Sequence, residues 1–145
     1  MSGAVPDAAA LADLRLTIAP EAAAPAAVLE PLVAYARGHA TGDPAHFRRA
    51  FRPTAHVEGI REHGFASWRL DDYCGLFLGA PAADEADRRR RLDVVRVTGT
   101  VATAAMTLHH GPDVFTDMFV LVAEDGEWRI ANKVYHRGTS TPSQR

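Results

Sequence analysis

The chain has 145 residues, 47% of them hydrophobic and 23% charged, a composition typical of one globular domain with its own core. Its formal net charge of −2 gives no electrostatic reason to expect nucleic acid or an acidic membrane surface as a partner. The single cysteine, Cys74, excludes an internal disulfide, and no apolar run reaches the ~18 residues that a membrane-spanning helix needs. We therefore expect a cytoplasmic protein of one domain.

The N-terminal stretch is rich in alanine and proline and has weak periodicity. Leu11, Leu14 and Ile18 can form one face of a short helix that docks on the domain or on a partner subunit; the alternative is a partly disordered arm. Charged residues interrupt this stretch, so it lacks the pattern of a signal peptide. We expect three regions along the chain, namely an arm over residues 1–25, a folded domain over 26–137 and a tail over 138–145.

Three helices are expected in the first half of the chain. The first runs from about residue 27 to residue 41, because apolar residues recur there at helical spacing and because Pro31 is tolerated only in a first turn. Asp43 and Pro44 have the character of the N-cap and the first residue of a short second helix. Asp71 is expected to cap a third helix.

Strands are expected in most of the remaining chain. Residues 55–61 and 65–69 predict two short strands, and residues 92–136 predict four long ones in a row, separated by short turns. The run Arg88–Arg91, in a polar loop, predicts a solvated surface, with an anion site as the alternative. The order of elements predicts an α+β fold, in which a curved antiparallel or mixed sheet of about six strands has three helices closing one face.

Four phrases of the sequence, in their order and spacing, resemble the nuclear transport factor 2-like superfamily of cone-shaped, cystatin-like domains. The phrases are YARGHATGD (35–43), AFRPTAHV (50–57), DMFVLV (117–122) and DGEWRI (125–130). The superfamily includes ketosteroid isomerase, SnoaL-like polyketide cyclases and a lumazine-binding-like group, to which this chain is most similar. The resemblance implies a mostly apolar pocket between the curved sheet and the helices, with a few polar groups converging in it.

The resemblance to ketosteroid isomerase can be followed residue by residue. Tyr35 falls on the position of that family's oxyanion-hole tyrosine. The phrase from His56 to Gly59 falls on the one that ends in its catalytic aspartate, so Gly59 stands where the base would be. Without this base, the proton transfer of the ketosteroid isomerase mechanism is not possible, so we expect a pocket that does not catalyse steroid isomerisation. The same comparison turns Val57 and Gly59 inward, and His56 and Glu58 outward.

Asp117 is the strongest candidate for a catalytic acid or base. It lies between Phe115 and Phe119 on one face of an expected strand, because side chains two residues apart share a face. A lone carboxylate among aromatic rings has its charged form disfavoured, so it can act as an acid or a base. The alternatives are that Asp117 pairs with a cation such as Arg96 or Lys133, or that it faces solvent.

Tyr35 is the second catalytic candidate, as a hydrogen-bond donor into the pocket; the alternative is a core tyrosine whose hydroxyl is satisfied. Core packing is also the alternative for the aromatic candidates that follow. The expected ligand-binding residues are Trp68, Tyr73, Phe115, Phe119 and, near the mouth of the pocket, His136. The seven histidines lack the spacing of a metal site and no cofactor motif is present, so we expect neither a metal nor a cofactor.

Two functions fit these residues. The first is a small-molecule pocket that supports acid–base chemistry such as isomerisation, dehydration or cyclisation, with Asp117 as acid or base and Tyr35 as donor. The second is a module without catalysis that binds a ligand or only associates. Both predict a homodimer through the outer sheet face, which is too apolar to stay wet. That face carries either Val101, Thr103, Ala105 and Thr107 or the opposite set.

Overall fold

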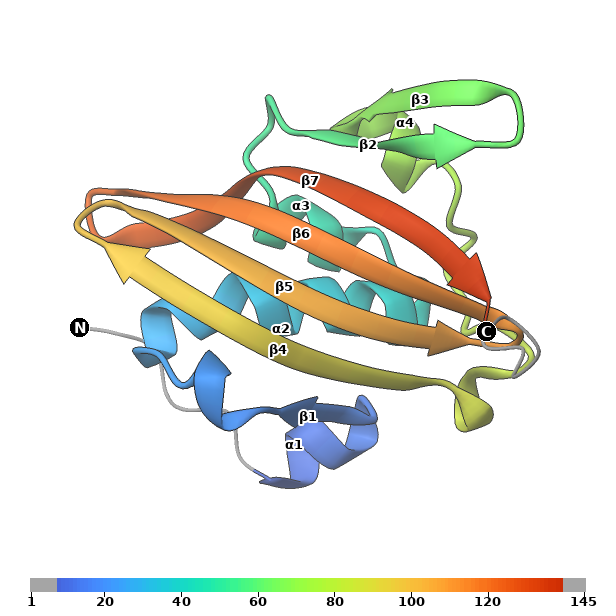
Figure 1. Ribbon diagram of the computed structural model, residues 1–145, viewed down its shortest axis with the longest axis horizontal. Coiled ribbons are helices and arrows are strands. Elements are labelled where there is room, and N and C mark those ends of the chain that lie inside the picture. The colour runs from blue at the N-terminus through green and yellow to red at the C-terminus, as the bar shows by residue number, and fades with distance from the viewer. Residues whose placement is uncertain (1–7, 140–145) are drawn as a thin grey trace.

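The computed structural model describes residues 8–139, in which one sheet is covered by helices on one face (Figure 1). The helices are α1 (Ala8–Asp13), α2 (Ala26–Thr41), α3 (Ala45–Ala50) and α4 (Leu70–Cys74), with single 3-10 turns at Pro20–Ala22 and Glu85–Asp87. The strands are β1 (Leu16–Ile18), β2 (His56–Arg61), β3 (Gly64–Arg69), β4 (Arg89–Thr98), β5 (Val101–His110), β6 (Asp113–Glu124) and β7 (Glu127–Thr139). None of the described helices is long and apolar enough to cross a membrane.

The sheet has seven strands in the order β1-β4-β5-β6-β7-β2-β3. The β1–β4 and β2–β7 pairs are parallel and the other pairs are antiparallel. The long strands β4 to β7 curve over α2 and α3, which lie behind them in Figure 1, while the β2–β3 hairpin stands beyond β7. The predicted α+β fold with a curved mixed sheet is confirmed, and the strand beyond the expected six is β1.

The face that each long strand turns toward the helices is now defined. On β5 the side chains of Ala102, Ala104 and Met106 are buried, whereas Val101 and Thr103 are exposed on the outer face. Alternation of this kind is what a sheet with one covered face requires. The first of the two sets considered for the outer face is therefore the correct one.

One irregularity decides which side chains of β7 face the helices. The pairing between β6 and β7 shifts at one point, where Val120 pairs with Asn132 but Leu121 pairs with Ile130, so Ala131 is an extra residue on β7. Such a bulge reverses the alternation beyond it. Ile130 and Lys133 are both buried for this reason, although they are three residues apart.

The N-terminal segment is held to the sheet through a buried ion pair. The Arg90 guanidinium, 1% exposed, donates to both carboxylate oxygens of Glu85 at 2.8 Å and to the carbonyl of Leu14 at 2.9 Å. Arg15 binds the same carboxylate. The expected solvated surface is wrong at Arg90, because Arg90 lies in strand β4 with its side chain inward, where Glu85 neutralises its charge.

The chain segments on either side of the expected domain are only partly described. Residues 16–18 of the expected arm form a strand of the sheet, and residues 138–139 of the expected tail belong to β7. Leu11 lies in α1, whereas Ile18 lies in β1, so the single short helix expected to carry both is not formed. Residues 1–7 and 140–145 of the two predicted segments lie outside the described residues.

Two details of the helices differ from expectation. Pro31 lies in the second turn of α2, not the first, because the helix begins at Ala26. Its ring is buried, and it cannot donate the backbone hydrogen bond of an ordinary residue at this position. The predicted cap of the third helix is wrong, because α4 begins at Leu70 with Arg69 at its N-cap, and Asp71 lies in its first turn. The prediction for Asp43 is confirmed in its role, since Asp43 Oδ1 accepts the N–H of Ala45 at 2.9 Å at the start of α3.

Candidate functional site

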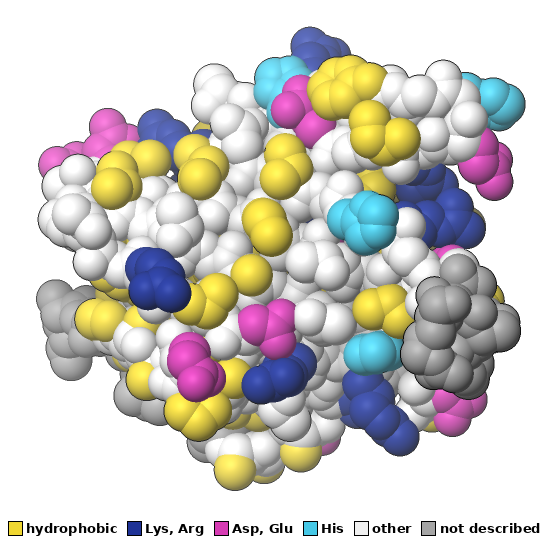
Figure 2. Space-filling view, viewed as in Figure 1, with side chains coloured by type: hydrophobic (Ala, Val, Ile, Leu, Met, Phe, Trp, Pro, Cys, Tyr) yellow, Lys and Arg dark blue, Asp and Glu magenta, His cyan; other side chains and the backbone are white. Residues whose placement is uncertain are grey.

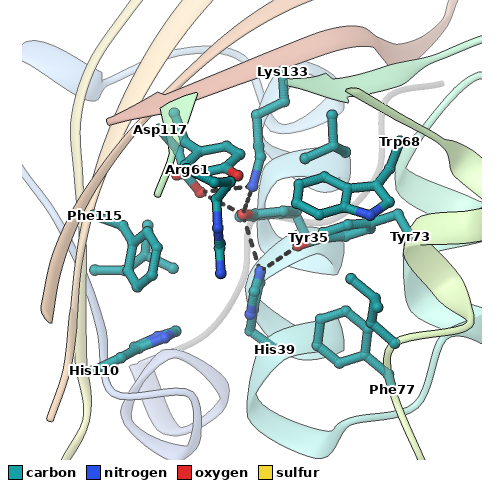
Figure 3. Close-up of a pocket in the computed structure, with 14 residues that line it drawn as sticks. Tyr35, His39, Arg61, Trp68, Tyr73, Phe77, His110, Phe115, Asp117 and Lys133 are labelled. Carbon is teal, nitrogen blue, oxygen red and sulfur yellow. Dashed lines mark hydrogen bonds and ion pairs between the residues drawn. The ribbon is translucent and has the colours of Figure 1, made fainter. Parts of the chain in front are cut away.

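A cavity of about 150 Å³ lies between α2, the β2–β3 hairpin, the segment after α4 and the inner face of β5 to β7. Its walls are mainly aromatic and aliphatic side chains. Those walls include Trp68, Tyr73, Phe77, Phe115, Val57 and Leu108. Figure 3 shows Asp117 and Lys133 reaching toward Tyr35 from the sheet side of the cavity, and His39 reaching toward it from α2.

Helix α2 contributes two polar side chains to the cavity. Tyr35 and His39 are four residues apart, so they lie one above the other on the same face of the helix. The Tyr35 ring is fully buried and packs edge-on against Phe51 and Phe119, with ring centroids 5.9 and 5.0 Å away. This packing fixes the direction of the Tyr35 hydroxyl.

The Tyr35 hydroxyl joins a buried acid to a buried amine. It donates a hydrogen bond to Asp117 Oδ2 and accepts one from Lys133 Nζ at 2.6 Å. Lys133 Nζ also lies 3.3 Å from Asp117 Oδ2. Asp117 is 2% exposed and Lys133 4%, so both groups are outside bulk water. Of the alternatives considered for Asp117, the structure shows pairing with Lys133, and Arg96 lies on the exposed face.

His39 extends this contact into a chain of four side chains. Its Nε2 atom is 3.0 Å from the Tyr35 oxygen and 2.9 Å from the Tyr73 oxygen. Which partner donates depends on the tautomer of the imidazole. Tyr73, His39, Tyr35 and Asp117 are thus linked in series by hydrogen bonds.

Burial sets the protonation of this network. Burial raises the pKa of both Tyr35 and Tyr73 well above the ordinary value, and the Asp117 carboxylate adds to the effect, so both remain phenols at neutral pH. Burial, followed by the charge of Lys133, lowers the pKa of His39 well below its ordinary value, so the imidazole is neutral. Burial also lowers the pKa of Lys133, against the opposing effect of Asp117.

Three further polar groups face the cavity. Within the described residues, the buried Nε2 of His110 and hydroxyl of Tyr135 have no hydrogen-bond partner. Burial, and then the charges of Arg88 and Arg90, lower the pKa of His110 to about 4. The Arg61 guanidinium lies 5.8 Å from the centre of the Trp68 ring at the edge of the cavity. These groups are available to the polar atoms of a ligand.

Most of the predicted site residues line this cavity, but two do not. Asp117, Tyr35, Trp68, Tyr73 and Phe115 all do. The placement expected for Phe119 and His136 needs correction. Phe119 is buried behind Tyr35, where the two rings pack together. His136 is exposed because it follows Tyr135 in β7 and alternates to the outer face.

The sequence reasoning missed half of the polar groups. His39, Arg61, His110 and Tyr135 were not proposed as site residues, and Lys133 was considered only as a partner of Asp117. For Lys133 a signal existed, because it is the only lysine among the 16 basic residues of the chain. Within residues 8–139 no three His, Cys, Asp or Glu side chains come together as they do around a metal ion.

The curved mixed sheet that wraps over helices is the fold of the nuclear transport factor 2-like class. Three solved structures, described as NTF2-like proteins of unknown function, share this fold. They come from Shewanella baltica OS155 (TM-score 0.70, 23% identity, 79% of this chain and 93% of that chain covered), Silicibacter pomeroyi DSS-3 (0.69, 25%, 78% and 94%) and Methylobacillus flagellatus KT (0.68, 26%, 78% and 90%).

Within that class the chain belongs to the family described as "Putative lumazine-binding", which matches residues 23–136. No curated protein sequence matches the chain.

Proposed function

We propose that the protein binds a small planar organic molecule in the cavity and catalyses acid–base chemistry on it, of the isomerase, dehydratase or cyclase type. One observation carries this proposal: a buried tyrosine hydroxyl is held between the carboxylate of Asp117 and the amine of Lys133 at the wall of a cavity. Asp117 would exchange a proton with the ligand, and the Tyr35 hydroxyl would stabilise negative charge that develops on a ligand oxygen.

The walls of the cavity support a planar ligand. Trp68 and Tyr135 are nearly parallel, with ring centroids 6.4 Å apart, and Phe115 closes the side next to Tyr135. Flat apolar surfaces of this kind favour flat ligands. The lumazine in the description of the family is a planar heterocycle with carbonyl groups, which agrees with such walls without singling out one ligand.

Two measurements test the proposal separately. Lumazine and the benzo-fused ketone 2-tetralone are titrated while the fluorescence of Trp68 is followed, with Trp128 replaced by Phe so that one reporter remains. Exchange of the 2-tetralone α-hydrogens in D₂O is then followed by NMR, because this exchange needs only an acid and a base. Wild-type protein is expected to accelerate it about 10²-fold or more relative to Asp117→Asn, which matches the range of general acid–base catalysis.

Binding without exchange would leave the second candidate, a ligand-binding protein without catalysis. One feature favours that candidate: Asp117 Oδ2 is already shared by Tyr35 and Lys133, so a ligand must displace one of them to reach this oxygen. If neither compound quenches Trp68, the cavity does not bind small planar carbonyl compounds and both candidates lose their support.

We also propose that a second copy of the chain covers the outer sheet face. Met118, Val120 and Val134 are 56%, 45% and 48% exposed and surround a hollow of about 380 Å³ whose walls carry no charge. Hydrophobic side chains gather over β5 to β7 in Figure 2. A two-fold axis would place this patch on itself, as in most homodimers. Sedimentation is expected to show a dimer that Val120→Glu converts to monomer; a wild-type monomer at micromolar concentration would contradict it.

Residence in the cytoplasm is proposed on one ground. The chain has a single cysteine, Cys74, and its thiol is free and buried. A chain without disulfides agrees with a reducing compartment.

A further inference from the structure

The chain contains a single lysine. Fifteen of the 16 basic residues are arginine, including the fully buried Arg90 and the arginines of the surface ion pairs. The single lysine, Lys133, lines the inner wall of the cavity. Arginine stays charged in proteins, whereas a buried lysine can lose its proton and become a nucleophile. Lys133 can therefore supply a free amine at this wall, which an arginine could not.

The fold directs the Lys133 amine to the cavity. The bulge at Ala131 turns Lys133 to the inner face of β7. Its Nζ atom lies 4.8 Å from the ring centre of Tyr35 and 5.3 Å from those of Tyr73 and Tyr135, so its surroundings are aromatic on three sides. Two hydrogen-bond partners, Tyr35 and Asp117, are within reach of the three donors of an ammonium group. One position on the nitrogen remains for a ligand.

We propose that Lys133 forms an imine with a small aromatic aldehyde or ketone held in the cavity. This inference rests on the proposed ligand-binding function and names the class of ligand. The aromatic walls would hold the ring, and the unpartnered Tyr135 hydroxyl and His110 Nε2 would bind a second polar group of the ligand. Burial, which lowers the pKa of Lys133 despite the opposing effect of Asp117, raises the fraction of free amine.

The neighbours of Lys133 suit the two proton transfers of imine formation. Nζ attacks the carbonyl carbon, and the C=O electron pair moves to oxygen. The nitrogen loses one proton to Asp117, while the oxygen gains one from the Tyr35 hydroxyl. The second nitrogen proton follows the same route as the C–O bond breaks, the C=N bond forms and water leaves. The Asp117–Tyr35 hydrogen bond returns each proton to Tyr35, so amine and carbonyl give imine and water without an oxidant or reductant.

Reductive trapping tests this inference on the whole protein. Benzaldehyde and sodium cyanoborohydride convert an imine into a stable benzyl amine, which peptide mapping assigns to a residue. The control is Arg91→Lys, since the Arg91 side chain is 60% exposed and lies on β4 away from the cavity. At pH 7, Lys133 is expected to be benzylated about tenfold faster than the lysine that this substitution introduces, and to keep that advantage at pH 6.

Equal or slower benzylation of Lys133 than of the introduced surface lysine would overturn the inference. Because wild-type Lys133 and the control are both mapped directly, the result does not depend on a variant of Lys133 that folds. The outcome is also separable from the proposed function. Quenching of Trp68 by 2-tetralone without benzylation of Lys133 would remove the imine and leave the binding cavity, whereas the absence of both would remove both.

Discussion

The ring of Tyr135 lies directly over Gly59. The two residues are opposite each other in the parallel pair β2–β7, and a Cβ atom on Gly59 would come 2.6 Å from Tyr135 Cζ and 2.7 Å from the Tyr135 carbonyl oxygen. Gly59 is also the position at which the resemblance to ketosteroid isomerase places a catalytic aspartate. The space for that base is therefore filled by a phenol ring, and any acid–base chemistry here has to use other groups.

Gly59→Ala is expected to destabilise the protein by about 1–3 kcal/mol, because the added methyl group overpacks a closed contact. Gly75→Ala is the matched control, since its nearest neighbour would be 3.4 Å away and its backbone is helical. That change should be neutral or slightly stabilising. Urea unfolding measures both, and equal free energies of unfolding for the two variants would show that Tyr135 moves aside freely.

Tyr35→Phe removes the hydroxyl that joins Asp117 to Lys133. We expect a loss of about 1–3 kcal/mol in the free energy of unfolding, because two buried charged groups each lose a partner. Tyr73→Phe removes a hydroxyl that contacts the neutral imidazole of His39, so its cost should be smaller. Urea unfolding of both variants checks this order; a larger loss for Tyr73→Phe would contradict it.

Arg90→Met is expected to cost about 3–5 kcal/mol, because it leaves a mostly buried Glu85 carboxylate with only Arg15 and leaves the Leu14 carbonyl without its donor. Arg91→Met, one residue further along β4, removes an exposed ion pair with Asp93 and should change stability by less than about 1 kcal/mol. Thermal unfolding compares the two. Similar melting temperatures would mean that the buried pair does not hold the N-terminal segment.

Acidification is expected to destabilise the protein between about pH 6.5 and 4. The pKa of His110 falls to about 4 in the folded protein, so the unfolded chain binds more protons throughout that window and stability declines as the pH falls. Each such histidine contributes a slope of up to about 1.4 kcal/mol per pH unit. His39, whose pKa is also lowered, acts in the same direction. Urea unfolding at several pH values should give a smaller slope for His110→Gln; an unchanged slope would exclude His110 as a source.

The long strands could be read from the sequence because their alternation and short turns are local features. The inward direction of Asp117 follows from the same alternation. The bulge at Ala131 could not be predicted from this alternation, because the extra residue does not change the pattern of apolar side chains in a recognisable way. The sequence therefore suggests Lys133 only as one possible partner of Asp117, whereas the shifted pairing of β6 and β7 shows that its side chain faces the cavity.

Other misses come from contacts between distant parts of the chain. Tyr35 and Asp117 were both candidates, yet 82 positions separate them and nothing local indicates that they touch. The sequence predicts a solvated surface for the run Arg88–Arg91, because runs of charged residues are usually solvated. Arg90 is an exception, because the 3-10 turn at Glu85–Asp87 brings the Glu85 carboxylate, five residues earlier in the chain, within hydrogen-bonding distance of its guanidinium.

The short strand β1 has a consequence for how the molecule behaves toward its neighbours in solution. A strand at the border of a sheet offers free N–H and C=O groups to any passing chain, which is a common start of aggregation. By pairing with Arg90, Arg91 and Leu92, β1 takes up part of that border on β4. The family match begins only at residue 23. A protein that began at residue 23 would lack β1 and would expose the unpaired backbone edge of β4, a site for aggregation.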